Sequence, residues 1–348
     1  MNSRLKKILQ TVVFLSTGIL ILYWVYYKQN QAYMAECALR GIAGKECSLL
    51  QKVYDDFRSA NVWYLLLVVV LYLISNVSRA LRWNMLLRPL DIKPKLSNSF
   101  FAVMLGYFAN LGLPRVGEII RAATLAKYEN EKVDRVMGTV IVDRVIDVIL
   151  MLLVIIIAMF SATGLLMDFI HENNDISNKI NSVLTSPILI GIVLIMLVIF
   201  VLLFKSKRIQ NSGPGKKIRT FILGVIEGLK TIRSLKNPTV FVLHSLNIWL
   251  MYYLMLYVGF SAFEPTASLG PLAGLIVFTL GSFGIVIPSP GGMGTYHFLV
   301  TAGLMLYGVN GADGFSFANI LFFTIQIFGN IIFGILAMVM LPFLNRGK

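Results

Sequence analysis

The chain is poor in the residues that most enzymes use for metal, redox or covalent chemistry. It holds two cysteines and three histidines in 348 residues, and the histidines stand far apart, at positions 171, 244 and 297. It also lacks a glycine-rich loop that leads into Lys-Ser or Lys-Thr, the pattern of a phosphate-binding loop for ATP. We therefore expect no metal, no cofactor and no ATPase activity within the chain, and no catalytic motif.

Acidic residues are also scarce, with 17 Asp and Glu against 31 Lys and Arg, and only 14% of the chain is charged. Hydrophobic residues make up 57% and form runs such as 140–160 and 188–204. Such runs are long enough to cross a hydrocarbon core of about 30 Å. The basic residues collect between the runs, as they do in cytoplasmic loops of membrane proteins. The pattern predicts an all-α, polytopic membrane protein whose partner is anionic lipid and not nucleic acid.

The first apolar run, residues 11–27, follows three basic residues and ends in Tyr-Trp-Val-Tyr-Tyr. A secretory signal peptide ends in a small-residue cleavage site, so we interpret this run as a retained first helix. Cys37 and Cys47 follow it, in a segment that the charge bias places outside the cytoplasm. An oxidising compartment permits a disulfide but does not require one, so a disulfide and two free thiols both remain open.

Residues 61–80 lead back to a basic segment on the cytoplasmic side. Residues 99–113 are too few to span comfortably, and the basic residues after them would lie outside if this piece crossed the membrane. A re-entrant hairpin from the cytoplasm solves both problems, because broken helix is tolerated at membrane depth where protein or a cavity surrounds it. Two complete crossings are the alternative.

Residues 137–160 and 187–204 form the next predicted pair of spanning helices. Between 205 and 236 the chain carries nine Lys or Arg against one acid, which predicts a cytoplasmic loop with a basic amphipathic helix on the inner leaflet. Residues 240–260 cross outward, and 315–344 return to a basic C-terminus. Both termini are thus expected in the cytoplasm of a bacterial cell, with the chain in the inner membrane.

A second break, Pro-Ser-Pro-Gly-Gly, interrupts the apolar segment 271–307. It predicts a second hairpin that enters from outside, so that the arrangement of residues 61–160 recurs inverted in 240–344. Inverted repeats with broken helices are typical of transporters. We therefore expect one domain, 1–348, with about six spanning helices and two re-entrant hairpins.

Charged residues within or beside the apolar runs form three pairs at i, i+3 spacing, with one further aspartate, Asp143: Arg79 with Arg82, Glu118 with Arg121, and Arg144 with Asp147. A lone charge in a membrane costs about 2.5–3.5 kcal/mol on insertion scales, so such residues pair with each other or face water. One interpretation is structural ion pairs, with Arg79 and Arg82 marking the cytoplasmic boundary. The other assigns phosphate binding to Arg121 and Arg144, held in place by Glu118 and Asp147.

The second break offers further candidates. Gly291, Gly292 and Gly294, after Pro290, permit positive φ and close approach of a ligand to the backbone, although tight helix packing explains them equally well. His297, one turn later, is a proton-linked gate or, as we favour, a hydrogen-bonded core histidine. Polar pairs on the last helices, such as Asn247 with His244 and Asn330 with Gln326, are expected to form interhelical hydrogen bonds.

Four segments in order resemble the lysylphosphatidylglycerol synthase transmembrane region, also called the flippase-like domain family: Leu81–Trp83, Pro114–Arg121 with Pro114 and Gly117, Asp143–Asp147, and Pro288–Gly294. The resemblance implies movement of lipids between leaflets, in the best-known case of aminoacylated phosphatidylglycerol. The family commonly has a glutamate where this chain has His297, which puts a role for a permanent carboxylate in doubt. In the best-known case the membrane region is fused to a soluble aminoacyl-transferring domain, which we do not expect here, so synthesis of lysyl-lipid is not expected.

From these observations we expect translocation of a phospholipid or a lipid-linked anionic substrate. Two other classes remain open. An intramembrane transferase would need paired carboxylates, for which only Glu118 and Asp147 qualify. A non-transporting partner of a lipid or glycan synthase would dock through the basic loop 205–236.

Overall fold

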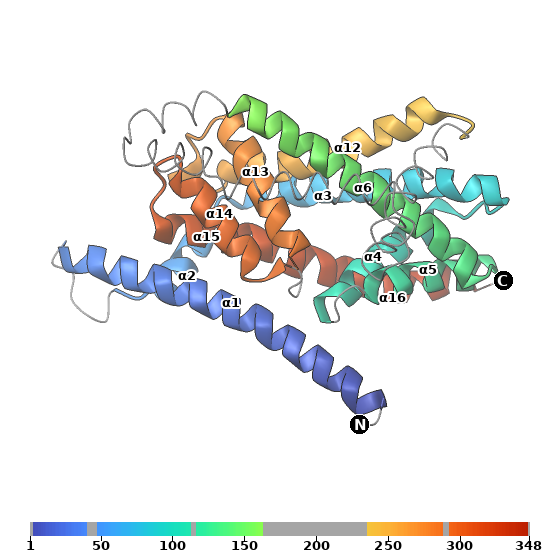
Figure 1. Cartoon of the computed structure of the whole chain (residues 1–348), viewed down its shortest axis with the longest axis horizontal. Helices are drawn as coiled ribbons and strands as arrows, with labels where there is room; N and C mark the ends of the chain where they lie inside the picture. The colour runs from blue at the N-terminus through green and yellow to red at the C-terminus, as the bar shows by residue number, and fades with distance from the viewer. Residues whose placement is uncertain (1–2, 40–46, 113–115, 163–234, 288–291, 347–348) are drawn as a thin grey trace, which may run out of the picture. The chain divides into compact units, whose positions relative to one another are not determined.

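The computed structural model describes residues 3–39, 47–112, 116–162, 235–287 and 292–346 (Figure 1). All regular elements in these ranges are helices. The chain forms two compact units, one made of Met1–Asp143 with Leu235–Lys348 and the other of Arg144–Ser234. The predicted crossing 187–204 and residues 205–234 of the basic loop lie outside the described residues.

The helices follow one another along the chain in the order drawn in Figure 1. They are α1 (Ser3–Leu39), α2 (Leu49–Ser59), α3 (Val62–Leu87), α4 (Leu96–Gly112), α5 (Val116–Glu129), α6 (Val133–Ser161), α12 (Pro238–Phe260), α13 (Pro271–Val286), α14 (Thr295–Met305), α15 (Gly311–Phe322) and α16 (Asn330–Leu344). A π-helical stretch, Phe323–Gly329, joins α15 to α16.

Three helical segments among the described residues are long and apolar enough to cross a membrane: Val62–Leu90, Pro238–Phe260 and Gly311–Leu344. Two shorter apolar helices, Leu96–Leu111 and Pro271–Val286, are the first arms of the two predicted hairpins. The chain is therefore a multi-pass helical membrane protein, as its sequence predicts.

α3 is the central helix of the first unit, since it packs against both α12 and α4. Asn247 on α12 donates to the Ser78 hydroxyl on α3 at 2.7 Å, and Tyr72 on α3 donates to Asn330 on α16 at 2.6 Å. These bonds confirm the expected interhelical role of Asn247 and Asn330. α3 also continues to Leu87, beyond the apolar run 61–80 that the sequence marks.

Both predicted hairpins are closed by glycines on facing arms. A methyl group on Gly117 of α5 would overlap the carbonyl oxygen of Gly106 on α4. A methyl group on Gly284 of α13 would lie 2.6 Å from the Cα atom of Tyr296 on α14. The arms therefore touch backbone to backbone in both hairpins, while the tips, residues 113–115 and 288–291, lie outside the described residues.

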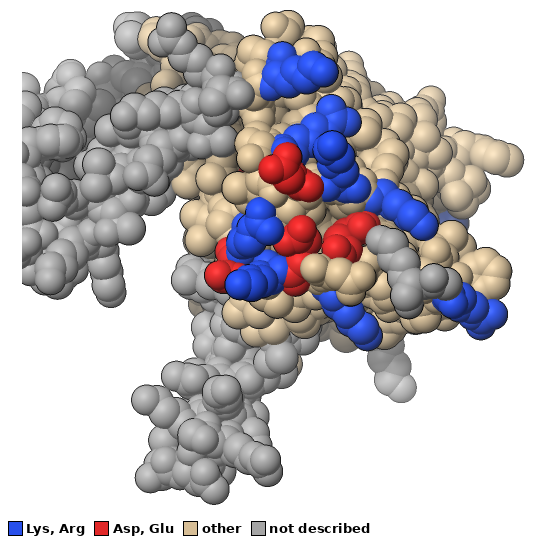
Figure 2. Space-filling view, turned by 90° about the vertical axis from the view of Figure 1, so that its right-hand side faces the viewer, with Lys and Arg blue, Asp and Glu red and all other residues tan. Residues whose placement is uncertain are grey.

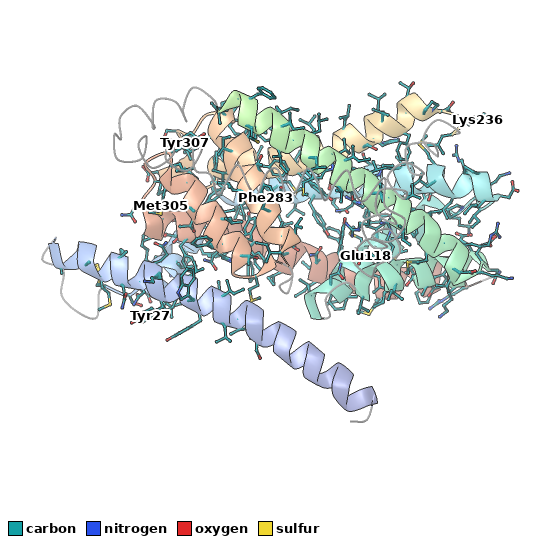
Figure 3. All side chains as sticks on the ribbon, in the orientation of Figure 1. Tyr27, Glu118, Lys236, Phe283, Met305 and Tyr307 are labelled. Atoms are coloured by element: carbon teal, nitrogen blue, oxygen red, sulfur yellow. A yellow bond between two sulfur atoms is a disulfide. The ribbon has the colours of Figure 1, made fainter. Side chains whose placement is uncertain are left out.

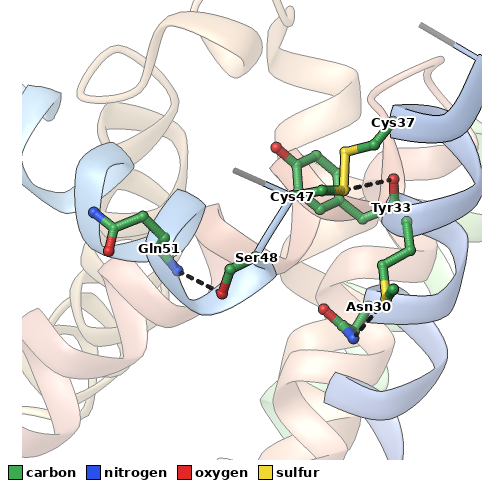
Figure 4. Close-up of a disulfide and its surroundings, with 7 residues drawn as sticks. Asn30, Tyr33, Cys37, Cys47, Ser48 and Gln51 are labelled. Atoms are coloured by element: carbon green, nitrogen blue, oxygen red, sulfur yellow. Dashed lines mark hydrogen bonds between the residues drawn. A yellow bond between two sulfur atoms is a disulfide. The ribbon is translucent and has the colours of Figure 1, made fainter. Parts of the chain in front are cut away.

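One end of the first unit is built around α2. Cys37 and Cys47 are joined by a disulfide between α1 and α2 (Figure 4). The Lys52 ammonium contacts Asp313 at 2.7 Å and Asp56 at 2.8 Å. Burial alone lowers the pKa of Lys52, but its hydrogen bonds to Asp313 and Asp56 outweigh this effect and raise the pKa above its ordinary value. α2 is thus fixed to the start of α15 and to the end of α1.

Charged side chains gather at the other end (Figure 2). Hydrogen bonds tie the elements there: Arg135 donates to the Leu90 carbonyl at 2.7 Å, and the Lys95 amide donates to Glu129 at 3.1 Å. The exposed basic side chains of this end are Arg88, Lys93, Lys95, Lys127, Lys132, Arg135, Lys236 and Arg346. We call this the basic end.

Candidate functional site

Asp143 on α6 is the centre of a buried ionic cluster. Its carboxylate contacts Arg82 Nη2 at 2.6 Å, Arg121 Nη1 at 2.9 Å and Arg79 Nη1 at 3.4 Å. All four side chains are at most 4% exposed. The arginines come from α3 and α5, so the contacts hold three helices together. We call Arg79, Arg82, Arg121 and Asp143 the arginine cluster.

Neutral side chains orient the guanidinium groups of α3. Arg79 donates to the Tyr252 hydroxyl at 3.0 Å, and Arg82 donates to the Ser245 hydroxyl at 3.4 Å. Both acceptors belong to α12, which lies along α3. The guanidinium groups of Arg79 and Arg82 therefore each contact the Asp143 carboxylate and also a neutral hydroxyl group of α12.

Trp83 positions the third arginine. The guanidinium carbon of Arg121 stands 3.9 Å from the centre of the Trp83 ring, which is a close cation–π contact. The indole nitrogen of Trp83 donates to the Thr139 hydroxyl on α6 at 2.9 Å. Arg121 is thus held between the indole of α3 and the carboxylate of α6.

The electrostatics of the cluster favour binding of anions. Arginine stays charged on burial, and its planar fork matches carboxylate and phosphate oxygens. In this structure the guanidinium groups contact a carboxylate of the protein itself, that of Asp143. Removal of one partner from a buried pair typically costs about 3–5 kcal/mol, because the remaining charge is left buried.

The other predicted charged residues lie outside this cluster. Arg144 and Asp147 belong to the second unit and contact each other at 3.8 Å, with the Arg144 side chain 40% exposed. Glu118 lies half-buried in the first turn of α5 (Figure 3). The i, i+3 spacing therefore identified a real pair at Arg144 and Asp147, while Arg79 and Arg82 are buried by protein.

The second break has the backbone that its glycines predict. Gly292 and Gly294 have φ values of +83° and +82°, which side chains rarely adopt. The Gly294 amide donates to His297 Nδ1 at 3.4 Å, and the buried imidazole packs against Phe322. This is the arrangement of a hydrogen-bonded core histidine.

Helix α1 covers the start of α14. A methyl group on Gly294 would stand 2.7 Å from the side chain of Ile21 and from the backbone nitrogen of Leu22. Pro290, Gly291 and Pro114 lie outside the described residues. In the described part of this break, Gly294 thus contacts α1, and Gly292 contacts Ile285 of α13.

Sequence reasoning underestimated Asp143, which it treated as an addition to the Arg144 pair, and missed Tyr252 and Ser245. It named Trp83 within the segment Leu81–Trp83 but did not predict its contact with Arg121. The adjacency of Arg82 and Trp83 did not signal this contact, because the ring stacks on Arg121 of α5 and neighbours at i, i+1 in a helix do not face each other. Within the described ranges, no three His, Cys, Asp or Glu side chains come together as metal ligands would.

Fold and site together define a multi-pass helical membrane protein with an ion-paired arginine cluster among apolar helices. Residues 49–343 match the family described as the lysylphosphatidylglycerol synthase TM region, and the chain belongs to this family. The resemblance found in the four sequence segments is thereby confirmed.

Archaeal membrane proteins are among the relatives of this chain. A UPF0104 membrane protein of Methanothermobacter thermautotrophicus is 27% identical over 271 residues, which cover 70% of this chain and 75% of that protein. A UPF0104 membrane protein of Methanocaldococcus jannaschii is 25% identical over 233 residues, 65% of this chain and 93% of that protein. No solved structure matches the chain.

Proposed function

We propose that the protein moves a phospholipid or a lipid-linked anionic substrate between membrane leaflets, and that the arginine cluster binds the phosphate of the headgroup. The observation that carries this proposal is the convergence of three guanidinium groups on one carboxylate among apolar helices. Guanidinium forks suit phosphate oxygens as well as carboxylates. Membership of a family named for a lipid synthase is consistent with a lipid ligand.

In this proposal Asp143 takes the place of the phosphate while no substrate is bound. Arg79 and Arg82 stand on α3, which is anchored to α12, whereas Arg121 stands on α5, the second arm of the first hairpin. A shift of α5 would separate Arg121 from Asp143 and let a phosphate enter between them. A substrate drives such a shift only if it binds the open state more tightly than the closed one.

The orientation follows from charge. The basic end faces the cytoplasm in our proposal, since Lys and Arg are enriched in cytoplasmic segments, and the disulfide then lies outside. The short helices α4 and α13 are proposed as first arms of re-entrant hairpins that enter from opposite sides. At 17 and 16 residues, they are shorter than the roughly 20 residues that a spanning helix needs.

The test is a flip assay with the purified protein in liposomes that carry headgroup-labelled phosphatidylglycerol. Access of a membrane-impermeant quencher to the label reports movement between leaflets. Arg121→Gln should slow the movement by about tenfold or more, because a hydrogen bond to a charged group contributes about 1.5–3 kcal/mol. Arg144→Ala in the same assay tests the predicted second phosphate ligand.

Arg135→Gln is the matched control, since it removes an arginine from the exposed basic end, where Arg135 pairs with Glu131. It should leave the rate at the parental value. Parental transport by a folded Arg121→Gln protein would overturn the assignment of Arg121. No movement of any lipid by the folded parent would instead favour a non-transporting partner of a synthase.

A further inference from the structure

Asn76 on α3 has one hydrogen-bonding atom that the fold does not use. The residue is 1% exposed. Its amide nitrogen donates to the Tyr72 carbonyl at 2.8 Å, while its amide oxygen, Oδ1, has no partner among the residues that the structure describes. The orientation of the amide is fixed, because a carbonyl only accepts and the nitrogen must face it.

The hydroxyl groups of α3 nearest to Asn76 in the sequence are engaged in other hydrogen bonds. The Tyr72 hydroxyl donates to Asn330 at 2.6 Å, the Ser75 hydroxyl donates to the Tyr72 carbonyl at 2.7 Å, and the Ser78 hydroxyl accepts from Asn247. A buried acceptor without a donor is destabilising, and nearly all buried polar groups in proteins are paired. Asn76 Oδ1 therefore points to a donor that the described part of the chain does not supply.

The position of Asn76 relative to the arginine cluster indicates the nature of that donor. Asn76 precedes Arg79 by three residues, so both side chains lie on one face of α3, with their Cβ atoms about 5–6 Å apart. A ligand whose phosphate contacts Arg79 can thus reach Asn76 with the next few atoms of its headgroup.

We propose that Asn76 Oδ1 accepts a hydrogen bond from a hydroxyl or ammonium group of the headgroup whose phosphate the arginine cluster binds. This inference rests on the proposed function and adds specificity to it. The arginines select a phosphate, and Asn76 selects a headgroup that carries a hydrogen-bond donor beyond that phosphate. A lipid with a phosphodiester but no such donor would contact the arginines and leave Asn76 Oδ1 without a hydrogen bond.

Phosphatidylglycerol and phosphatidylmethanol separate the two requirements, because both are singly charged phosphodiesters and only the first has headgroup hydroxyls. In the flip assay the parent should move phosphatidylglycerol about two- to tenfold faster, the range expected for one neutral hydrogen bond. Asn76→Leu, which is similar in shape and removes the acceptor, should reduce this ratio to about one by slowing phosphatidylglycerol alone.

Ser75→Ala is the matched control. It removes a neighbouring buried side chain that also donates to the Tyr72 carbonyl, so it changes α3 without touching the proposed acceptor. It should keep the parental ratio. Asn76→Ala repeats the test without added volume, in case leucine does not fit the site.

A binding assay distinguishes failure of this inference from failure of the proposed function. Short-chain phosphatidylglycerol should raise the thermal unfolding temperature of the detergent-solubilised parent more than phosphatidylmethanol does, and this difference should vanish in Asn76→Leu. If no lipid is transported but the difference is found, the inference stands and translocation falls. If the parent treats the two lipids alike in both assays, or if Asn76→Leu and Asn76→Ala keep the preference, the inference is overturned and the site of Asn76 Oδ1 holds no more than water.

Discussion

At the scale of single residues, the arginine cluster depends on the charge of one carboxylate. Asp143 is fully buried and receives contacts from three guanidinium groups that belong to two other helices. Each arginine has at least one further neighbour, such as Tyr252, Ser245 or Trp83. Asp143 has the central position, so its charge acts on all three at once.

We predict that Asp143→Asn destabilises the protein strongly. The substitution keeps the shape of the side chain but removes its charge, and the loss of one partner from a buried ion pair costs about 3–5 kcal/mol. Thermal unfolding in detergent measures the effect. Glu131→Gln is the control, because it breaks an exposed i, i+4 pair with Arg135 that contributes about 0.5 kcal/mol or less. Equal unfolding temperatures for the two variants would contradict the central position of Asp143.

The sequence revealed the residues of this cluster but not their pairing. Spacing along one helix identifies neighbours on that helix, and it correctly paired Arg144 with Asp147. The partner of Arg79 lies 64 residues away and that of Arg121 lies 22 residues away. Such contacts depend on how α3, α5 and α6 pack, which no local pattern contains.

At the scale of helical elements, glycine decides how closely the arms of each hairpin approach. Gly106 faces Gly117 in the first hairpin, and Gly284 faces Tyr296 in the second. The Gly117 amide also donates to the Asn110 side chain at 2.8 Å, which supports the start of α5 from the arm that it packs against. The first hairpin carries Arg121, so its packing also determines where that guanidinium stands.

We predict that Gly117→Ala disturbs both stability and the cluster. The added methyl group would overlap the Gly106 carbonyl and the Asn110 side chain, and overpacking typically costs about 1–3 kcal/mol. Thermal unfolding and the flip assay should both decline. Gly138→Ala on α6 is the control, because no atom lies within 4 Å of the added methyl group. It should stabilise the helix by about 0.5–1 kcal/mol. The same response from both variants would exclude a contact effect.

The sequence predicted where the helices lie along the chain more accurately than the residues at which they begin and end. The apolar segments 240–260 and 315–344 correspond to α12 and to α15 through α16. α3 extends beyond the apolar run 61–80, and protein contacts bury Arg79 and Arg82 within it. The contact of α1 with Gly294 was not predictable, since Ile21 and Gly294 are distant in the sequence and meet only through packing.

At the scale of the whole chain, the first unit has two ends of different chemistry. One end carries the disulfide and the Lys52 ion pairs with Asp56 and Asp313, and the other carries the exposed lysines and arginines of the basic end. The sequence predicted this separation through the distribution of charge between apolar runs. It left the disulfide open, because two cysteines in one segment do not show whether their sulfur atoms meet.

We predict that the two ends lie on opposite sides of the cell membrane. A cysteine introduced as Asp55→Cys on α2 should react with an impermeant maleimide on intact cells, because this exposed position lies at the end that we place outside. Lys93→Cys at the basic end should react only after the cells are permeabilised. The parent is the control, since Cys37 and Cys47 are bonded to each other. The reverse pattern would invert the proposed orientation.

The stacking of Arg121 on Trp83 also gives the protein an optical signal of its own. Indole fluorescence responds to a charge close to the ring. Here the charge is the Arg121 guanidinium of α5, the helix whose shift is proposed to admit substrate. The other tryptophans are Trp24, Trp63 and Trp249. Replacement of these three by phenylalanine would leave Trp83 as the single tryptophan. Its emission wavelength and intensity should then report the distance between its ring and the Arg121 guanidinium in real time, without an attached dye.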